Sequence, residues 1–451
     1  MKKFDTISRR DILRWGGSSA SLGMLAQLTA MQRAARADPN VGYKALVCVY
    51  LYGGNDSFNL IVPTSSGEYA TYAASRQNLA VAQNLLLPIT PATSTGVTWG
   101  LHPSVPELVT LFGAQKLAIV GNVGSLVAPI TKAEYESGAV ERPPQLFSHS
   151  DQGDQWMFGA ALAEVQKIGW CGRVGENLAA WNPGSVMAMN ISLDGSNTMQ
   201  MGPTQAPYNL GVSGPTQLSG FWGTQGTLRR QAFDALRTKQ QANKLEQGFA
   251  DVLNDSVAIE AMISAALDAG PTLATTFPTS WLGQQLAMVA RMISVQSAIG
   301  QMRQIYFVGK GGFDTHGNQN TDQPVLYADV AQCLGAFQAA MAELGAEPNV
   351  TTFTASEFGR TLSSNAQGTD HGWGSHHLVL GGAVAGGDLY GTLPDLTLDG
   401  PDDLGGGRLI PTTSVEQYAA TLAQWFGVAP GDLPTIFPNI GNFTSPTLGF
   451  V

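Results

Sequence analysis

Five short apolar runs constrain the fold of this chain more than any other feature of its sequence. Each lacks the alternation of polar and apolar residues that marks a one-sided strand, so each is typical of a strand buried on both faces of a parallel sheet. The runs span residues 45–52, 116–123, 186–193, 305–308 and 350–355. A sixth run, at 377–382, predicts one more strand. Because such a sheet needs helices on both faces, the sequence predicts an α/β fold with a mostly parallel central sheet.

Helical spacing of apolar residues separates the last two of the five runs. Residues 322–345 carry apolar side chains three and four positions apart, and Gly345 marks the C-terminal cap. Strand, helix and strand form a βαβ unit, for which we expect a right-handed crossover. A second helix is predicted at 414–426, with Thr413 and Glu416 as its capping box and Gly427 at its end.

Residues 195–280 have a different character from the rest of the chain. A polar stretch rich in Gly, Pro and Gln leads into helical sequence, and no strand-like run interrupts it. We interpret this region as an insertion that caps one side of the sheet. A mobile surface arm is the alternative.

The first 37 residues have the features of an export signal. Arg9 and Arg10 are adjacent within SRRDILR, a weakly apolar stretch follows, and residues 35–37 form a small-residue cleavage pattern. Neither this stretch nor any later one is long and apolar enough to predict a membrane-spanning helix. We therefore expect a soluble protein that the twin-arginine export machinery carries to the periplasm or the cell exterior.

Charge and cysteine content narrow the classes of partner and site. Removal of residues 1–37 takes away seven Lys/Arg and two Asp/Glu, which leaves 17 basic and 32 acidic residues and a formal charge of −15. A chain this acidic is not expected to bind nucleic acid. Cys48, Cys171 and Cys333 lie far apart, without the paired spacing of a zinc knot, and allow at most one disulfide. We expect Cys48 and Cys333 to be buried thiols.

The six histidines are confined to four short stretches. His102 and His149 stand alone, His316 lies in GGFDTHG, and the remaining three lie in GTDHGWGSHH at 368–377. Random scatter does not produce such clustering. A metal site does, because neutral imidazole and carboxylate are the usual protein ligands of Zn, Mn and Fe.

Acidic residues follow the predicted strands at the points where ligands bind in open parallel sheets, beyond their carboxyl ends. Asp56 follows the first strand, and Asp314 with His316 follows the run at 305–308. Glu357 and Arg360 follow the run at 350–355, and Asp370 with His371 lies in the next loop. The sequence therefore predicts one metal site to which several strand ends contribute.

Each of these residues also has a purely structural interpretation. Asp56 fits a turn, the Asp314 segment fits a helix N-cap, and Glu357 fits an ion pair with Arg360. His102 fits a helix cap or a residue that orients a ligand. Of His376 and His377, one fits a buried histidine that supports the site.

The order of the motifs along the chain resembles a known family. SRRDIL, YLYGGNDSFNLIVP, LHPSVPEL, KLAIVGNVG, SHS, GGFDTHGNQ, SEFGRT, GTDHGWGSHHLVLGGAVAGGDLYG and TTSVEQYAATLAQWFG are similar to the exported bacterial family numbered 1501 among domains of unknown function. That family is grouped with the alkaline phosphatase and sulfatase superfamily. The resemblance implies a single three-layer α/β sandwich over residues 38–451, with one or two divalent metals beside a nucleophile.

The resemblance also assigns metal ligands residue by residue. Asp56 corresponds to the first metal Asp, and Asp314 with His316 to the Asp and His after a mid-chain strand. The next Asp-His pair of the superfamily falls on Glu357 and Phe358, where the His is missing, so the resemblance implies an altered second metal site. The last metal His matches His371, with His376 as the rival.

The nucleophile corresponds to a helix start after the second strand. The family usually has Ser-His-Phe there, and this chain has Ser148, His149 and Ser150. Ser148 is the expected nucleophile, with His149 as a ligand or base and Ser150 or water as alternatives. Ser57, beside the first metal Asp, is less favoured.

These inferences lead to two hypotheses of different classes. The favoured one is an exported metal-dependent hydrolase of small anionic sulfate or phosphate esters, with a divalent ion (Zn, Mn, Ca or Mg) as cofactor. In it, Arg360 clamps the anion bidentately, and Asp370 ligates the metal or orients His371. The alternative is a non-catalytic member of the superfamily that acts as a partner or assembly factor for another exported protein.

Overall fold

A central sheet with strand order β11-β5-β10-β9-β1-β8-β6-β7 organises the protein, and β12 adds to it beside β5. A computed structural model describes residues 42–161 and 168–451, so the predicted signal at 1–37 lies outside the described residues. The strands are β1 (Lys44–Leu51), β5 (Leu117–Gly124), β6 (Asn190–Ser192), β7 (Tyr208–Asn209), β8 (Arg303–Lys310), β9 (Val350–Ala355), β10 (Ser375–Gly381), β11 (Leu389–Tyr390) and β12 (Thr413–Ser414).

Pairing within the sheet confirms the prediction of a mostly parallel arrangement. β1 pairs in parallel with both β8 and β9, and β8 pairs in parallel with β6. β10 is antiparallel to β5 and β9, so the predicted sixth strand reverses direction inside the sheet. The run at 186–193 forms only the three residues of β6. A separate antiparallel sheet contains β2 (Ile61–Pro63), β4 (Trp99–Leu101) and β3 (Leu87–Ile89).

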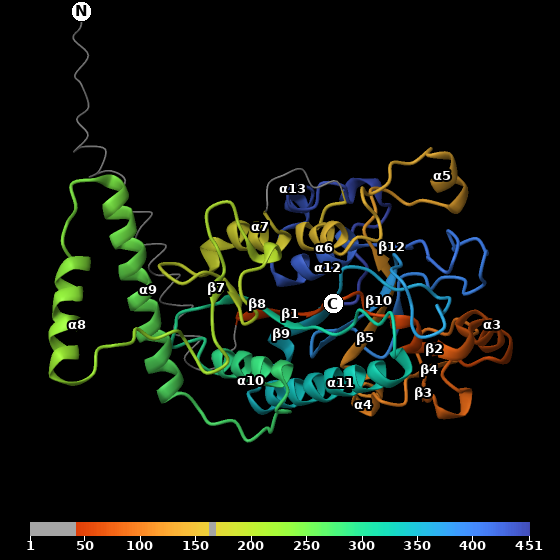
Figure 1. Cartoon of the computed structure of the whole chain (residues 1–451), viewed down its shortest axis with the longest axis horizontal. Coiled ribbons are helices and arrows are strands. Elements are labelled where there is room, and N and C mark those ends of the chain that lie inside the picture. Colours follow the sequence, from red (N-terminus) through yellow and green to blue (C-terminus); the bar gives the residue numbers. More distant parts are fainter. Residues whose placement is uncertain (1–41, 162–167) are drawn as a thin grey trace, which may run out of the picture. The chain divides into compact units, whose positions relative to one another are not determined.

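Helices cover both faces of the central sheet (Figure 1). One face carries α6 (His149–Phe158), α7 (Trp170–Asn177), α12 (Val415–Phe426) and α13 (Leu433–Ile436), and the other carries α4 (Pro106–Gly113), α10 (Trp281–Ser294) and α11 (Gln319–Glu343). Leu46, Cys48 and Tyr50 of β1 point into the core beneath α12, because alternate residues of a strand face opposite sides. The three layers are the predicted α/β sandwich.

The remaining helical segments lie outside these two layers or are short. They are α3 (Ser66–Arg76), α5 (Lys132–Ser137), α8 (Gly223–Arg237), α9 (Lys244–Ala269) and the 3-10 turns η1 (Ser57–Asn59), η2 (Gln77–Leu79), η3 (Gln83–Leu85), η4 (Ala179–Trp181), η5 (Thr198–Gln200), η6 (Glu347–Asn349), η7 (Pro430–Asp432) and η8 (Ile440–Asn442).

Two predicted helix ends need correction. The capping box of α12 is formed by Ser414 and Gln417, one position after the predicted pair. Thr413 is instead a strand residue of β12, and Glu416 accepts hydrogen bonds from Asn439. α11 begins at Gln319, earlier than predicted, and Leu344 is its C-cap, so the predicted Gly345 follows the cap in the left-handed conformation, with φ 62°.

The insertion differs from its predicted placement. It contributes the short edge strand β7, and α8 and α9 form a hairpin beside that edge of the sheet instead of capping a face (Figure 1). The C-terminal half of α9 packs inward, since Ile259 and Ile263 are buried.

Two further predictions are tested by the described residues. All three cysteines are buried and free, as expected for Cys48 and Cys333. Against the prediction for later stretches, α11 is long and apolar enough to cross a membrane by length and composition. It packs against α10 and α4 and buries Gln319, Gln323 and Gln338, so it is a helix of the protein core.

Candidate metal centre

The candidate site lies where β9, β1 and β8 end side by side. The register pairs Leu51 with Lys310 and Tyr50 with Ala355, so the loops that follow these strands begin at one edge of the sheet. β10 runs the opposite way, so the loop that precedes Ser375 reaches the same edge. With the N-terminus of α6, five segments distant in sequence therefore meet in one place.

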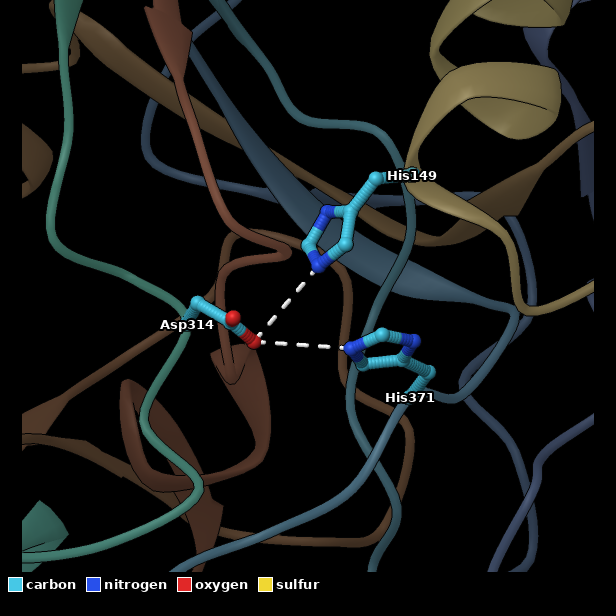
Figure 2. Close-up of side chains that lie close together, drawn as sticks. All are labelled: His149, Asp314 and His371. Carbon is cyan, nitrogen blue, oxygen red and sulfur yellow. Dashed lines mark ion pairs between the residues drawn. The ribbon is translucent and has the colours of Figure 1, made fainter.

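Three side chains from three of these segments form the centre of the site (Figure 2). His149 comes from the first residue of α6, Asp314 from the loop after β8, and His371 from the loop before β10. One ligand atom from each lies within 4.8 Å of the others. Asp314 Oδ1 is 3.6 Å from His149 Nε2 and 3.5 Å from His371 Nε2.

A third imidazole, that of His316, completes the group. Its Nε2 lies 3.1 Å from Asp314 Oδ1 and 3.0 Å from His371 Nε2. His316 Nδ1 is 2.9 Å from a carboxylate oxygen of Asp370, and His371 Nδ1 is 2.8 Å from the Phe147 carbonyl oxygen. Since both partners accept only, each Nδ1 carries a hydrogen and the two Nε2 atoms face each other. At 3.0 Å they form a hydrogen bond when one of them also carries a hydrogen, and two unprotonated Nε2 atoms repel unless a cation lies between them.

Asp370 therefore contacts the second ring nitrogen of His316 and orients that ring. An orienting role was one of the two expected for Asp370, but the histidine expected was His371. Its Oδ1 also accepts a hydrogen bond from Asn365 Nδ2 at 3.1 Å. Partial burial raises the pKa of Asp370, but the hydrogen bonds from Asn365 and His316 outweigh it and hold the pKa below its usual value. Burial lowers the pKa of His371, which favours the neutral ring that a metal requires.

Arg360 holds the Asp314 carboxylate in place. Its Nη1 donates to Asp314 Oδ1 and to the Gly53 carbonyl, both at 2.8 Å, and its other nitrogens donate to Thr369. Partial burial raises the pKa of Asp314, but the hydrogen bond and charge of Arg360 outweigh it and hold the pKa below its usual value. The Arg360 guanidinium is fully buried against the Asp314 carboxylate. The predicted substrate clamp would require an exposed guanidinium, so the observed position does not fit that role. Its ionic partner is Asp314, not Glu357.

Glu357 lies at the border of the group. Its carboxylate accepts hydrogen bonds at 3.0 Å from the backbone N–H groups of Gly53 and Gly54, and Oε1 is 3.7 Å from His149 Nδ1. The loop needs both glycines: they have φ 115° and 79°, and a Cβ would lie 2.3 Å from Asp314 N at Gly53 and 2.2 Å from the Phe358 ring at Gly54. Glu357 thus fixes the loop that supports Asp314.

Asp56 is not brought together with the histidines. Its carboxylate is 1% exposed and forms a 2.5 Å ion pair with Arg76 Nη2, and the same oxygen accepts a hydrogen bond from Gln319. The other oxygen accepts from Phe58 N at 3.2 Å, so Asp56 is the N-cap of η1. These contacts agree with the structural interpretation, in which Asp56 is a turn residue.

Ser148 is the N-cap of α6, directly between Phe147 and His149. Its Oγ is 2.6 Å from Asp151 Oδ2 and 3.1 Å from Ser150 Oγ. The hydroxyl of the expected nucleophile therefore donates to a carboxylate three residues later on the same helix. Asp151 carries no motif in the sequence that would predict this contact.

The other three histidines and Ser57 lie in the core. His102 Nδ1 accepts from Ser104 N, and burial lowers the pKa of His102 to about 4. His376 Nδ1 accepts from Asn122 N at 2.9 Å, and the backbone N–H of His376 donates to Ser57 Oγ, so the rival ligand lies outside the group. Burial lowers the pKa of His376 to about 4 and that of His377 to about 3.

Several contributors were missed because they carry no sequence signal of chemistry. Arg76 neutralises Asp56 from a distant helix. Phe147 acts through its backbone carbonyl and has a positive φ of 70°, which is strained for a residue with a side chain. Phe358, for which the resemblance implied a histidine, packs its ring 4.8 Å from that of His149 and 4.7 Å from that of His371.

The residues present fit a single divalent metal. His149, Asp314 and His371 each offer one ligand atom within 4.8 Å of the others, and His316 Nε2 lies close to Asp314 and His371. Imidazole and carboxylate together are a donor set favoured by Zn and similar ions. His316 and His371 are each oriented through the second ring nitrogen, as is common for metal-binding histidines. Within the described part of the chain, no second carboxylate joins Asp314 among these donors.

Comparisons with known proteins identify the family of this chain. None of the curated proteins matches it. Solved structures that resemble it include the crystal structure of Ps i-CgsB in complex with k-i-k-neocarrahexaose, with TM-score 0.33, 10% identity and coverage of 88% of this chain and 77% of that chain. The PsFucS1 sulfatase from Pseudoalteromonas sp. has TM-score 0.30, 9% identity and coverage of 82% and 69%. Residues 43–432 match the family described as "Protein of unknown function (DUF1501)", and the chain belongs to this family.

Proposed function

We propose that this protein is an exported, metal-dependent hydrolase of anionic sulfate or phosphate esters. The observation that carries the proposal is the pair of imidazole Nε2 atoms of His316 and His371, 3.0 Å apart with both Nδ1 atoms engaged. Two Nε2 atoms that face each other in this way offer lone pairs to a cation, and Asp314 supplies negative charge beside them. The predicted signal at residues 1–37 supports export by the twin-arginine route.

Four side chains would hold the ion: His149, Asp314, His316 and His371. A divalent ion bound there polarises an S–O or P–O bond and lowers the pKa of a bound water or hydroxyl group. Arg360 holds Asp314 in place and balances its charge. His149 begins α6, so the unpaired N–H groups of that helix start at the site and favour an anion.

Ser148 is the nucleophile that these contacts favour. A serine hydroxyl is a weak nucleophile unless a base accepts its proton. Asp151 Oδ2, 2.6 Å from Ser148 Oγ, is placed to accept it. Because the mature chain is acidic overall, with 32 acidic and 17 basic residues after residue 37, substrate anions depend on this local positive charge.

Metal content is the first test. The purified protein should bind about one equivalent of Zn, Mn, Ca or Mg after reconstitution with each in turn, as measured by elemental analysis. His316→Ala and His371→Ala should abolish this binding. His102→Gln is the matched control, since His102 lies outside the group and its loss leaves the metal bound. Absence of stoichiometric metal in the wild-type protein with all four ions would refute the proposal.

Turnover is the second test. Aryl sulfates and aryl phosphates, assayed with the metal-loaded protein, should reveal hydrolysis of one class. Ser148→Ala should abolish it while metal content stays unchanged, and Ser150→Ala should retain it. Full activity in Ser148→Ala would transfer the nucleophile's role to water or to Ser150.

A second candidate function has one observation in its favour. Two of the predicted acidic ligands are already satisfied within the protein, Asp56 by Arg76 and Glu357 by the backbone of Gly53 and Gly54. The site is therefore poorer in carboxylates than the resemblance implied. A non-catalytic partner or assembly factor for another exported protein would bind the metal and hydrolyse neither ester class.

A further inference from the structure

The α8–α9 hairpin carries an uncovered apolar surface. Leu245, Phe249 and Val252 at the start of α9 are 85%, 72% and 66% exposed, and Leu236 of α8 is 69% exposed. These side chains lie close together, since three of them line one groove of about 530 Å³. Contiguous apolar surface of this kind marks an interaction site in a soluble protein.

The exposed side chains continue a stripe that is buried farther along the same helix. Leu245, Phe249 and Val252 are spaced four and three residues apart, and Ile259 and Ile263 extend the same spacing. Ile259 and Ile263 are buried. One helix therefore has a single apolar face that its own chain covers only in the second half.

Two of the charged residues beside the stripe, Lys244 and Asp255, have opposite charges and lack ionic partners among the residues that the structure describes. Asp251 on the same flank instead accepts a hydrogen bond from Gln247 Nε2. Lys244, the first residue of α9, has no acidic partner within the described parts of the chain, and the helix dipole opposes a cation at that end. Asp255 likewise has no ionic partner among these residues. The two are separated by about three helical turns, so they lie on the same side of α9, flanking the stripe.

We propose that the N-terminal half of α9 pairs in antiparallel fashion with the same segment of a second copy of this chain. A two-fold axis near Phe249 places Leu245 of each copy against Val252 and its neighbours in the other. The same axis places Lys244 of each copy opposite Asp255 of the other, and it does so twice, because a two-fold interface repeats every contact. The groove between α8 and α9 receives the apolar side chains of the second copy.

This arrangement keeps the two protein bodies apart. The C-terminal half of α9 packs against its own body, near Arg291 of α10 and the loop at 211–217. In an antiparallel pair, the C-terminal half of the partner's α9 points in the opposite direction, past Lys244 and away from this protein body. Figure 1 shows α8 and α9 as a hairpin beside the edge of the sheet that β7 forms.

The full chain tests the proposal by light scattering after gel filtration over about 1 to 100 µM. The wild-type protein should be a dimer at the upper end. Lys244→Glu and Asp255→Lys should each weaken dimerisation by at least about tenfold, because each replaces two attractive pairs with two repulsive ones. An equimolar mixture of the two variants should dimerise again, since their heterodimer restores attraction at both positions.

Apolar substitutions provide the second arm. Phe249→Ser should give a monomer with an unchanged circular dichroism spectrum, because the side chain is 72% exposed. The matched control is Val325→Ser in α11, which is 68% exposed and lies outside the hairpin, and it should remain a dimer. A wild-type monomer at the highest concentration overturns the proposal, and binding of that monomer to anionic vesicles would assign the surface to a membrane. Failure of the mixed variants to dimerise overturns the antiparallel register.

Discussion

Replacement of Asp56 by alanine is expected to reduce stability and to leave the bound metal in place. The side chains of Asp56 and Arg76 are both completely buried and form a 2.5 Å ion pair. The Asp56 carboxylate also accepts hydrogen bonds from Gln319 and Phe58. Its loss leaves the Arg76 guanidinium in the protein interior without a counter-charge.

The expected cost is about 3–5 kcal/mol, the range for removal of one partner of a buried ion pair. A loss of this size is a large part of the roughly 5–15 kcal/mol that stabilises a folded domain. Arg76→Met should cost a similar amount, for the converse reason. Asp56→Leu combined with Arg76→Met removes both charges, so the double variant should be more stable than the sum of the single losses predicts.

Urea unfolding at pH 7, followed by tryptophan fluorescence, measures these changes, and elemental analysis measures metal on the folded protein. The superfamily resemblance makes the opposite prediction, since it assigns Asp56 as a metal ligand. An Asp56→Ala variant with wild-type stability and no bound metal would refute the structural argument. Ser57 next to it would then need a new interpretation as well.

Three further outcomes follow from the structure. Asp370→Ala should weaken metal binding by about 10–100-fold without loss of stability, because it removes the acceptor that orients the His316 ring; an unchanged metal titration would contradict this. Gly54→Ala should destabilise the fold by about 1–3 kcal/mol and displace the Phe358 ring, as measured by urea unfolding. His376 and His377 stay neutral in the fold and protonate when it unfolds, so stability, complete above about pH 6.5, should fall by about 2 kcal/mol for each by pH 5. His377→Asn should reduce that fall by about half.

The sheet was predictable from the sequence because its strands are buried on both faces. Such strands appear as continuous apolar runs. Four of the five runs match β1, β5, β8 and β9 to within about two residues at each end, and the fifth run is longer than its strand, β6. The orientation of β10 was not predicted, since an apolar run carries no information on direction. The placement of the α8–α9 hairpin was also missed, because a half-covered apolar stripe looks the same in sequence as a fully buried one.

The site was predictable to the level of residue types and not to the level of individual contacts. Clustered histidines and strand-end acids identified His316, His371 and Asp314, which the structure brings together. Asp56 satisfies the same pattern and lies elsewhere, because Arg76, which binds it, comes from a helix that no pattern connects to it. By its position in the sequence, His376 was an alternative metal ligand to His371. Its side chain lies in the core on the reversed strand β10, where Nδ1 accepts a hydrogen bond from Asn122 N.

Three of the four predicted acidic ligands already have strong partners within the protein. Asp56 is neutralised by Arg76, Asp314 forms an ion pair with Arg360, and Glu357 accepts hydrogen bonds from backbone N–H groups. The remaining donors are imidazoles, which are uncharged when they bind a metal. A divalent ion in the proposed site would therefore retain most of its charge for a substrate. A site with more free carboxylates would cancel that charge, and in so acidic a protein it would lose the attraction that an anionic ester requires.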